Sequence, residues 1–253
     1  MYFLSAKKVH LFGIQNELNG EQINYVLDEN ELLDKGINGT LSLVFDGIKQ
    51  FSKGEKHLKL TCDNCVGQNK NNVTLWLCLY LVVCGYYESV ELSTMIAGHT
   101  KFKVDGNFGM IKKRYRKSTI YSKEDFVKVV ERSSSLNKVQ CYKNGRGFSY
   151  YDFKVLEKYF EKLFKIGKYH HFLFSADRLG VVKVKEFIDS EWEEVSLWKD
   201  KERVVESIRE FKSLIFTILE PKPLSLERQE YLYKNIQPLL PKEYWCNAFL
   251  QQS

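Results

Sequence analysis

Two aspartates stand where predicted strands give way to helices, and this placement favours metal chemistry. Asp63 follows a strand predicted at residues 58–62, and Asp105 follows one predicted at 90–96. A carboxylate at the carboxyl end of a strand lies at a sheet edge where loops and ligands meet, and the sheet holds its backbone rigidly. Carboxylate oxygens are ligands that Mg²⁺ prefers. The two side chains could therefore share one or two ions that act in phosphoryl transfer.

A simpler interpretation stays open for each of these residues. An aspartate after a strand often caps a helix or forms a turn. His99, just before Asp105, could contact metal or phosphate, could hold Asp105, or could be a structural side chain. Cys62 and Cys65 form a C-x-x-C pair, but no second pair lies at zinc-site spacing. This pattern favours small buried apolar residues over a zinc site.

The loop that follows Asp63 is rich in side-chain amides, contributed by Asn64, Gln68, Asn69 and Asn71. Such amides could bind phosphate, or they could order the loop through side-chain to backbone hydrogen bonds. The sequence does not choose between these roles.

A basic segment follows the second aspartate. Its cationic residues are Lys101, Lys103, Lys112, Lys113, Arg114, Arg116 and Lys117, with Phe102, Phe108 and Tyr115 interleaved. Beside a metal site, this pattern predicts a phosphate backbone as the partner. The alternative is a solvated helix face.

Hydrophobic periodicity predicts the elements that position these residues. The first 120 residues are expected to form strands at 9–14, 22–27, 58–62 and 90–96, helices at 37–51 and 73–83, and a third helix after Asp105. This order predicts an α/β mixed sheet with flanking helices. The later part predicts a capped helix at 122–132, helices at 152–164, 202–216 and 225–236, and strands at 171–174 and 181–184.

Composition limits the class of protein. The chain has 253 residues, with 44% apolar and 28% charged residues, 6 Cys and a net charge of +6. These values exclude a collagen, a disordered tail and a disulfide-rich secreted scaffold. No secretory signal or membrane-spanning run is visible, which predicts an intracellular protein without a membrane partner. The mild positive charge permits an anionic partner.

Two segments resemble signatures of a transposon-derived family whose members are labelled a domain of unknown function. Residues 62–72, C-D-N-C-V-G-Q-N-K-N-N, resemble its D-N-C-x-G-Q-N-K-N-N motif. Residues 98–114 resemble its G-H-T-K-F-x-x-D-x-x-F-G-x-x-K-x-R motif, and residues 169–172 and 224–233 resemble two further stretches. The resemblance covers almost the whole chain. It implies an RNase H-like fold of the transposase and integrase kind, with a core at 1–135 and an α+β extension at 136–253.

Such enzymes use three carboxylates with Mg²⁺ or Mn²⁺ to cut and join DNA strands. The resemblance implies that Asp63 is the second acid and Asp105 the third, with Asn64, Gln68, Asn69 and His99 in support. In longer relatives the first strand and its acid lie upstream of the stretch that matches Met1–Leu4. We therefore expect this chain to lack the first acid and a central strand, which leaves its catalytic status open.

The resemblance implies DNA as the partner, a nuclear location and an origin in a transposable element, and it is compatible with a homo-oligomer. A second hypothesis is a domesticated, non-catalytic module that binds nucleic acid or protein. Metal dependence separates the two hypotheses, because only the enzyme needs Asp63 for activity.

Overall fold

The computed structural model describes residues 4–65, 67–95, 103–142 and 147–245. Contacts divide the chain into two compact units. Unit 1 comprises Met1–Leu33, Lys101–Ser149 and Glu220–Ser253, and unit 2 comprises Asp34–Thr100 and Tyr150–Leu219. Both units draw on segments from either side of residue 135, and neither ends there.

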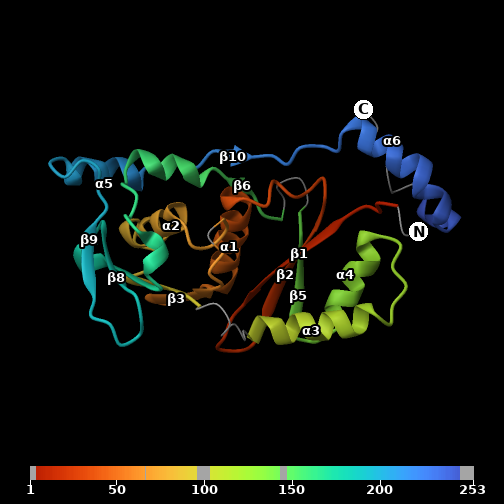
Figure 1. Ribbon diagram of the computed structural model, residues 1–253, viewed down its shortest axis with the longest axis horizontal. Coiled ribbons are helices and arrows are strands. Elements are labelled where there is room, and N and C mark those ends of the chain that lie inside the picture. Colours follow the sequence, from red (N-terminus) through yellow and green to blue (C-terminus); the bar gives the residue numbers. More distant parts are fainter. Residues whose placement is uncertain (1–3, 66, 96–102, 143–146, 246–253) are drawn as a thin grey trace. The chain divides into compact units, whose positions relative to one another are not determined.

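Unit 1 holds a three-stranded sheet in the order β1-β2-β5 (Figure 1). Strand β1 (Val9–Gln15) pairs antiparallel with β2 (Gln22–Asp28), which pairs parallel with β5 (Asn137–Cys141). Gly20, with a φ of 76°, lies in the turn between β1 and β2, as the Asn-Gly signal predicts, because glycine takes up positive φ without steric cost.

Two helices pack on this sheet. They are α3 (Lys103–Tyr115) and α4 (Lys123–Glu131). Val26 of β2, Ile111 of α3 and Val130 of α4 form one buried cluster. The capping box predicted before α4 is present, since Ser122 and Asp125 each accept a hydrogen bond from the other's backbone amide.

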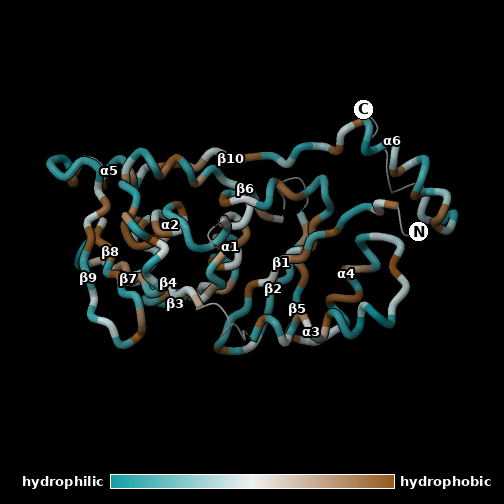
Figure 2. Tube along the Cα trace, viewed as in Figure 1, coloured by the Kyte–Doolittle hydropathy of each residue, from teal (hydrophilic) through white to brown (hydrophobic). Residues whose placement is uncertain are grey.

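The end of unit 1 is a short helical segment. It contains α6 (Leu226–Asn235), η4 (Gln237–Leu239) and η5 (Lys242–Tyr244). Arg228 of α6 donates to Glu29 at 2.9 Å and to the carbonyls of Ser5 and Ala6 at 2.9 and 2.8 Å. Figure 2 shows α6 as largely hydrophilic, so these polar contacts, rather than a broad apolar face, tie it to the N-terminal segment.

Unit 2 holds a five-stranded mixed sheet in the order β3-β4-β7-β8-β9. Its strands are β3 (His57–Cys62), β4 (Ser89–Thr94), β7 (His171–Ser175), β8 (Val181–Lys185) and β9 (Glu193–Ser196). Strands β3 and β4 are parallel, and the other pairs are antiparallel. The remaining elements are α1 (Ile37–Phe51), α2 (Asn72–Val83), β6 (Tyr150–Tyr151), η1 (Phe153–Lys158), η2 (Ile166–Lys168), η3 (Ala176–Arg178), α5 (Val204–Lys212) and β10 (Ile218–Leu219).

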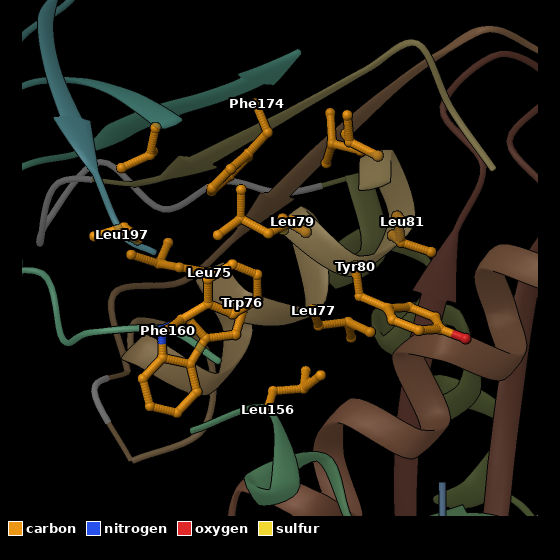
Figure 3. Close-up of a cluster of buried hydrophobic side chains, with 14 of the residues drawn as sticks. Leu75, Trp76, Leu77, Leu79, Tyr80, Leu81, Leu156, Phe160, Phe174 and Leu197 are labelled. Atoms are coloured by element: carbon orange, nitrogen blue, oxygen red, sulfur yellow. The ribbon is translucent and has the colours of Figure 1, made fainter. Parts of the chain in front are cut away.

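Helix α2 is the centre of the core of unit 2. Every residue from Val73 to Val83 is buried, as its uniformly apolar sequence predicts, and Figure 2 shows most of it as hydrophobic. In Figure 3 its side chains meet Leu156 of η1, Phe174 of β7, and Phe160 and Leu197. Gly85, with a φ of 76°, ends the helix in a Schellman turn, in which Tyr86 N donates to Leu81 O at 2.9 Å.

The structure confirms the α/β class but differs from the predicted elements in two ways. The first four strands do not share one sheet, because β1 and β2 pair with β5 while β3 and β4 pair with β7. The helix predicted at 152–164 is only the 3₁₀ helix η1 followed by irregular chain. In this segment Glu161 N donates to Leu197 O at 2.7 Å, and Leu163 N donates to Asn72 Oδ1 at 2.7 Å. These tertiary partners take the place of the helical i→i−4 bonds.

The other predicted helices are present, although α5 is shorter than the predicted range 202–216. In the described part of the chain, no helix combines the length and apolarity needed to cross a bilayer.

Candidate functional site

Asp63 lies where the sequence predicted it, directly after the last residue of β3. Because β3 and β4 are parallel, with Cys62 opposite Thr94, their carboxyl ends meet at the same edge of the sheet. The side chain of Asp63 is exposed. Within the described residues, β3 pairs with β4 alone. Strand β3 is therefore the edge strand of this sheet in the described part of the chain, and Asp63 lies exposed at its carboxyl end.

One carboxylate oxygen of Asp63 already has a local role. Its Oδ1 accepts from Cys65 N at 3.0 Å and from Asn69 Nδ2 at 2.7 Å, which is the turn-forming role that aspartate often has after a strand. From the described residues, no hydrogen bond reaches Oδ2. The turn thus fixes the carboxylate and leaves its second oxygen available.

The amide-rich loop is ordered by its own hydrogen bonds. Gln68 Nε2 donates to Lys35 O at 3.2 Å, and Asn71 caps α2 by accepting from Thr74 N at 3.1 Å. The structure therefore supports loop ordering as one role of these amides, and phosphate binding stays a prediction. Asn64 differs, because its Oδ1 is buried without a hydrogen-bond partner among the described residues.

Lys70, which the sequence did not single out, is a buried cation at the end of this loop. Its side chain is almost fully buried at 1% exposure, and its Nζ donates to Gly167 O at 2.8 Å. Burial lowers the pKa of Lys70. No described carboxylate forms an ion pair with it. A lysine inside an otherwise polar motif gives no sequence signal of burial, so only the fold reveals it.

Two histidines of the third family stretch lie beside β4 and serve different sides of the sheet. His170 Nδ1 lies 3.2 Å from Thr94 Oγ1, and His171 Nδ1 lies 3.1 Å from Ser93 Oγ. Thr94 is buried and Ser93 is not, so the two rings lie in different environments and do not share one site. Burial lowers the pKa of both, and the charge of Lys70 adds to the shift of His170.

The two cysteines of the C-x-x-C pair lie in different environments. Burial, followed by the negative charge of Asp63, raises the pKa of Cys62 to about 12. Cys65 is exposed, so the expectation that both are buried apolar residues is wrong for Cys65. It lies in the turn, where its N–H and carbonyl are used in loop bonds.

Asp105 lies in the first turn of α3 with its side chain exposed. It belongs to unit 1 and Asp63 to unit 2, so the pairing of their carboxylates stays a prediction. Among the described residues, no group of three or more histidine, cysteine or acidic side chains could hold a metal ion. The unbonded oxygens of Asp63 and Asn64 are the hard donors that Mg²⁺ takes, but two donors do not complete a site. His99 and Lys101 lie outside the described residues.

The other basic residues are on and just after α3. All six are exposed, namely Lys103, Lys112, Lys113, Arg114, Arg116 and Lys117. None forms an ion pair with a carboxylate in the described ranges. Three of them lie in the last turn of α3, where cations also favour the helix dipole. The surface is available to an anion, and DNA as that anion stays a prediction.

The model of the family described as Domain of unknown function (DUF7869) matches residues 4–190. The chain belongs to this family. The match includes Asp63, the amide loop, α3 and the paired histidines, and it ends before α5. No curated protein and no solved structure matches the chain. The family description assigns no activity, so function has to be argued from the side chains themselves.

Proposed function

We propose that this chain is part of a transposase-like enzyme that cleaves and joins DNA strands with Mg²⁺ or Mn²⁺. The observation that carries the proposal is the placement of Asp63, exposed at the carboxyl end of a parallel strand with Oδ2 unbonded by described residues. Such a fixed carboxylate is what phosphoryl-transfer sites use to hold a divalent ion. The proposal includes an RNase H-like ancestry and implies a nuclear location.

In this proposal Asp63 and Asp105 hold the metal, which when bound polarises a phosphoryl oxygen and eases deprotonation of the attacking hydroxyl. Asn69 keeps Oδ1 of Asp63 in the turn and so directs Oδ2 toward the ion. The basic residues of α3 bind the phosphate backbone and orient it. A third carboxylate is required in addition to these two.

The second candidate is a non-catalytic DNA-binding module. It is favoured by the six exposed cations of the α3 region and by the lack of a three-ligand cluster among the described residues. Such a module would use the phosphate contacts of α3, because these contacts do not depend on metal.

Metal binding tests the enzyme proposal even where turnover is weak. Mg²⁺ and Mn²⁺ are titrated into the purified chain while Tm is followed, since a ligand that binds the native state raises Tm by mass action. We expect a rise in Tm that is lost in Asp63→Asn, which keeps an acceptor for Cys65 N, and retained in the control Asp189→Asn from an exposed loop. Nicking of supercoiled plasmid DNA is then assayed with the same three proteins.

Equal metal responses in Asp63→Asn and wild type would refute Asp63 as a ligand. DNA binding is tested separately, in EDTA. The double variant Lys112→Glu and Arg114→Glu should weaken DNA binding. The slope of log K against log salt concentration should become less negative by about 0.9 for each phosphate contact that is lost. Lys201→Glu with Arg209→Glu, also exposed, is the matched control. Loss of metal response with intact DNA binding would leave the binding module as the function.

A further inference from the structure

A cleft of about 1170 Å³ opens in unit 1 beside the basic helix α3. Its walls come from β1, α3, α4 and the segment around η5. Small-molecule pockets usually measure about 300–1,000 Å³. The cleft is therefore large enough for more than one flat ring, and no residue singled out for metal chemistry lines it.

One face of α3 supplies the wall nearest the basic residues. Phe108, Ile111, Lys112 and Tyr115 all line the cleft, and their spacing of three, four and seven residues places them on one side of a helix. Ile111 is buried at the base, while Lys112 is exposed and Tyr115 is 51% exposed. The rim of this wall thus combines a cation with a large accessible aromatic ring.

A second aromatic group also lines the cleft. Tyr121, 42% exposed, lies before α4, and its ring centroid is 5.2 Å from that of Tyr244. Tyr115 is braced by Phe126, with ring centroids 6.0 Å apart at 84°. This edge-to-face contact leaves a face of the tyrosine ring free for stacking.

Charge is distributed unevenly around the cleft. The α3 side continues into Lys113, Arg114, Arg116 and Lys117 without an acidic residue. On the other walls the charges are mixed. Asp28 is paired with Lys7 at 2.8 Å, and the exposed Glu124 and Glu243 are accompanied by the exposed cations Lys128 and Lys242. A polyanion is therefore attracted most strongly to the α3 rim.

We propose that the cleft binds unpaired nucleobases of a single DNA strand whose phosphates lie along the basic rim of α3. Bases stack on Tyr115 and Tyr121, and Lys112 contacts the phosphate between them. Stacking platforms beside a cationic track are how proteins bind single strands without sequence preference. Because the densest positive charge lies along α3, the backbone follows that rim and the bases turn into the cleft. The inference rests on the proposed function for DNA as the partner, and it adds a preference for unpaired strands.

Fluorescence anisotropy with labelled oligothymidine, in EDTA and at low salt, tests this site apart from metal. We expect Tyr115→Ala to weaken single-strand binding about ten- to hundredfold, because base stacking on an aromatic ring contributes on that order. Tyr115→Phe should bind like wild type. The control is Tyr233→Ala, since Tyr233 of α6 is equally exposed at 51% and does not line the cleft; it should bind like wild type.

The substitution Tyr115→Ala also removes the packing of Tyr115 against Phe126. A second readout therefore uses the other tyrosine of the cleft. In wild type, 2-aminopurine within the strand should be quenched on stacking, and Tyr121→Ala should lower this quenching. Equal binding by Tyr115→Ala and Tyr233→Ala, or a Phe variant as weak as the Ala variant, would overturn the inference. If duplex DNA binds through Lys112 and Arg114 without a tyrosine effect, the stacking site fails and the proposed function survives. If neither strand form binds, both fail.

Discussion

Gly180 offers a demanding test of the packing in unit 2, through the substitution Gly180→Ala. Its φ is +80°, and a Cβ built on it would lie 1.7 Å from Nε1 and 2.2 Å from Cδ1 of Trp198. Trp198 is 2% exposed, and its Nε1 donates to Leu179 O at 3.0 Å. Its ring centroid lies 4.7 Å from that of Phe160. The indole therefore cannot keep its place once a methyl group is present.

The magnitude follows from two separate costs. A positive φ costs an alanine about 1 kcal/mol relative to glycine. Displacement of Trp198 from its site costs about as much as truncating a buried aromatic residue, on the order of 3–5 kcal/mol. We expect Gly180→Ala to lower the free energy of unfolding by about 4–6 kcal/mol, a large part of the ~5–15 kcal/mol typical of a domain.

The assay is urea unfolding followed by tryptophan fluorescence, with the free energy taken from the midpoint and slope. Gly85→Ala is the matched control, because Gly85 has a φ of +76° and no heavy atom lies within 4 Å of the position that a Cβ would take there. It should cost only about 1 kcal/mol, the backbone part alone. A Gly180→Ala midpoint equal to that of Gly85→Ala would refute the packing described for Trp198.

Three further predictions concern capping, pH and thiol reactivity. Ser122→Ala should cost about 1 kcal/mol of unfolding free energy by urea titration, because it removes the capping box; an unchanged midpoint would contradict the cap. Burial lowers the pKa of His170 and His171 in the folded state, so the unfolded chain takes up protons first as pH falls below about 6.5, and stability should decline. The double variant His170→Asn and His171→Asn should show a smaller change in Tm between pH 7 and pH 5 than wild type. Tm curves of variant and wild type that run parallel over this pH range would argue against a contribution of the two histidines. Exposed Cys65 should react with Ellman's reagent in the native protein. Cys62, with its pKa raised to about 12, should react only after unfolding. Mass spectrometry of the labelled peptides shows which thiol reacts in each state, and labelling of Cys62 in the native protein would contradict its burial.

Local signals carried much of the prediction of secondary structure. The Asn-Gly turn, the capping box at Ser122 and the all-apolar stretch at 73–83 each depend on neighbouring residues alone, and each is present. The strand that ends before Asp63 was predicted from its alternation, and the structure places Asp63 at its carboxyl end. Such features are set by backbone preference and side-chain period.

Strand pairing was not predictable in this way. Strand β5 pairs parallel with β2 although it follows more than a hundred residues later, and this pairing separates β1 and β2 from the sheet of β3 and β4. The segment 153–163 has helical spacing of apolar residues, but its amides bond to side chains and carbonyls from distant parts of the chain. Long-range partners override a local period where they satisfy the backbone better.

The sequence by itself determined the α/β class, most helices and strands, the position of Asp63 and the basic character of α3. These depend on residue type and near neighbours. Only the tertiary structure decided that Lys70 is buried, that Asp63 uses one oxygen in a turn, and that Tyr115 and Lys112 line a cleft with Tyr121. Burial and contact depend on which distant segments pack together, and no local pattern encodes that choice.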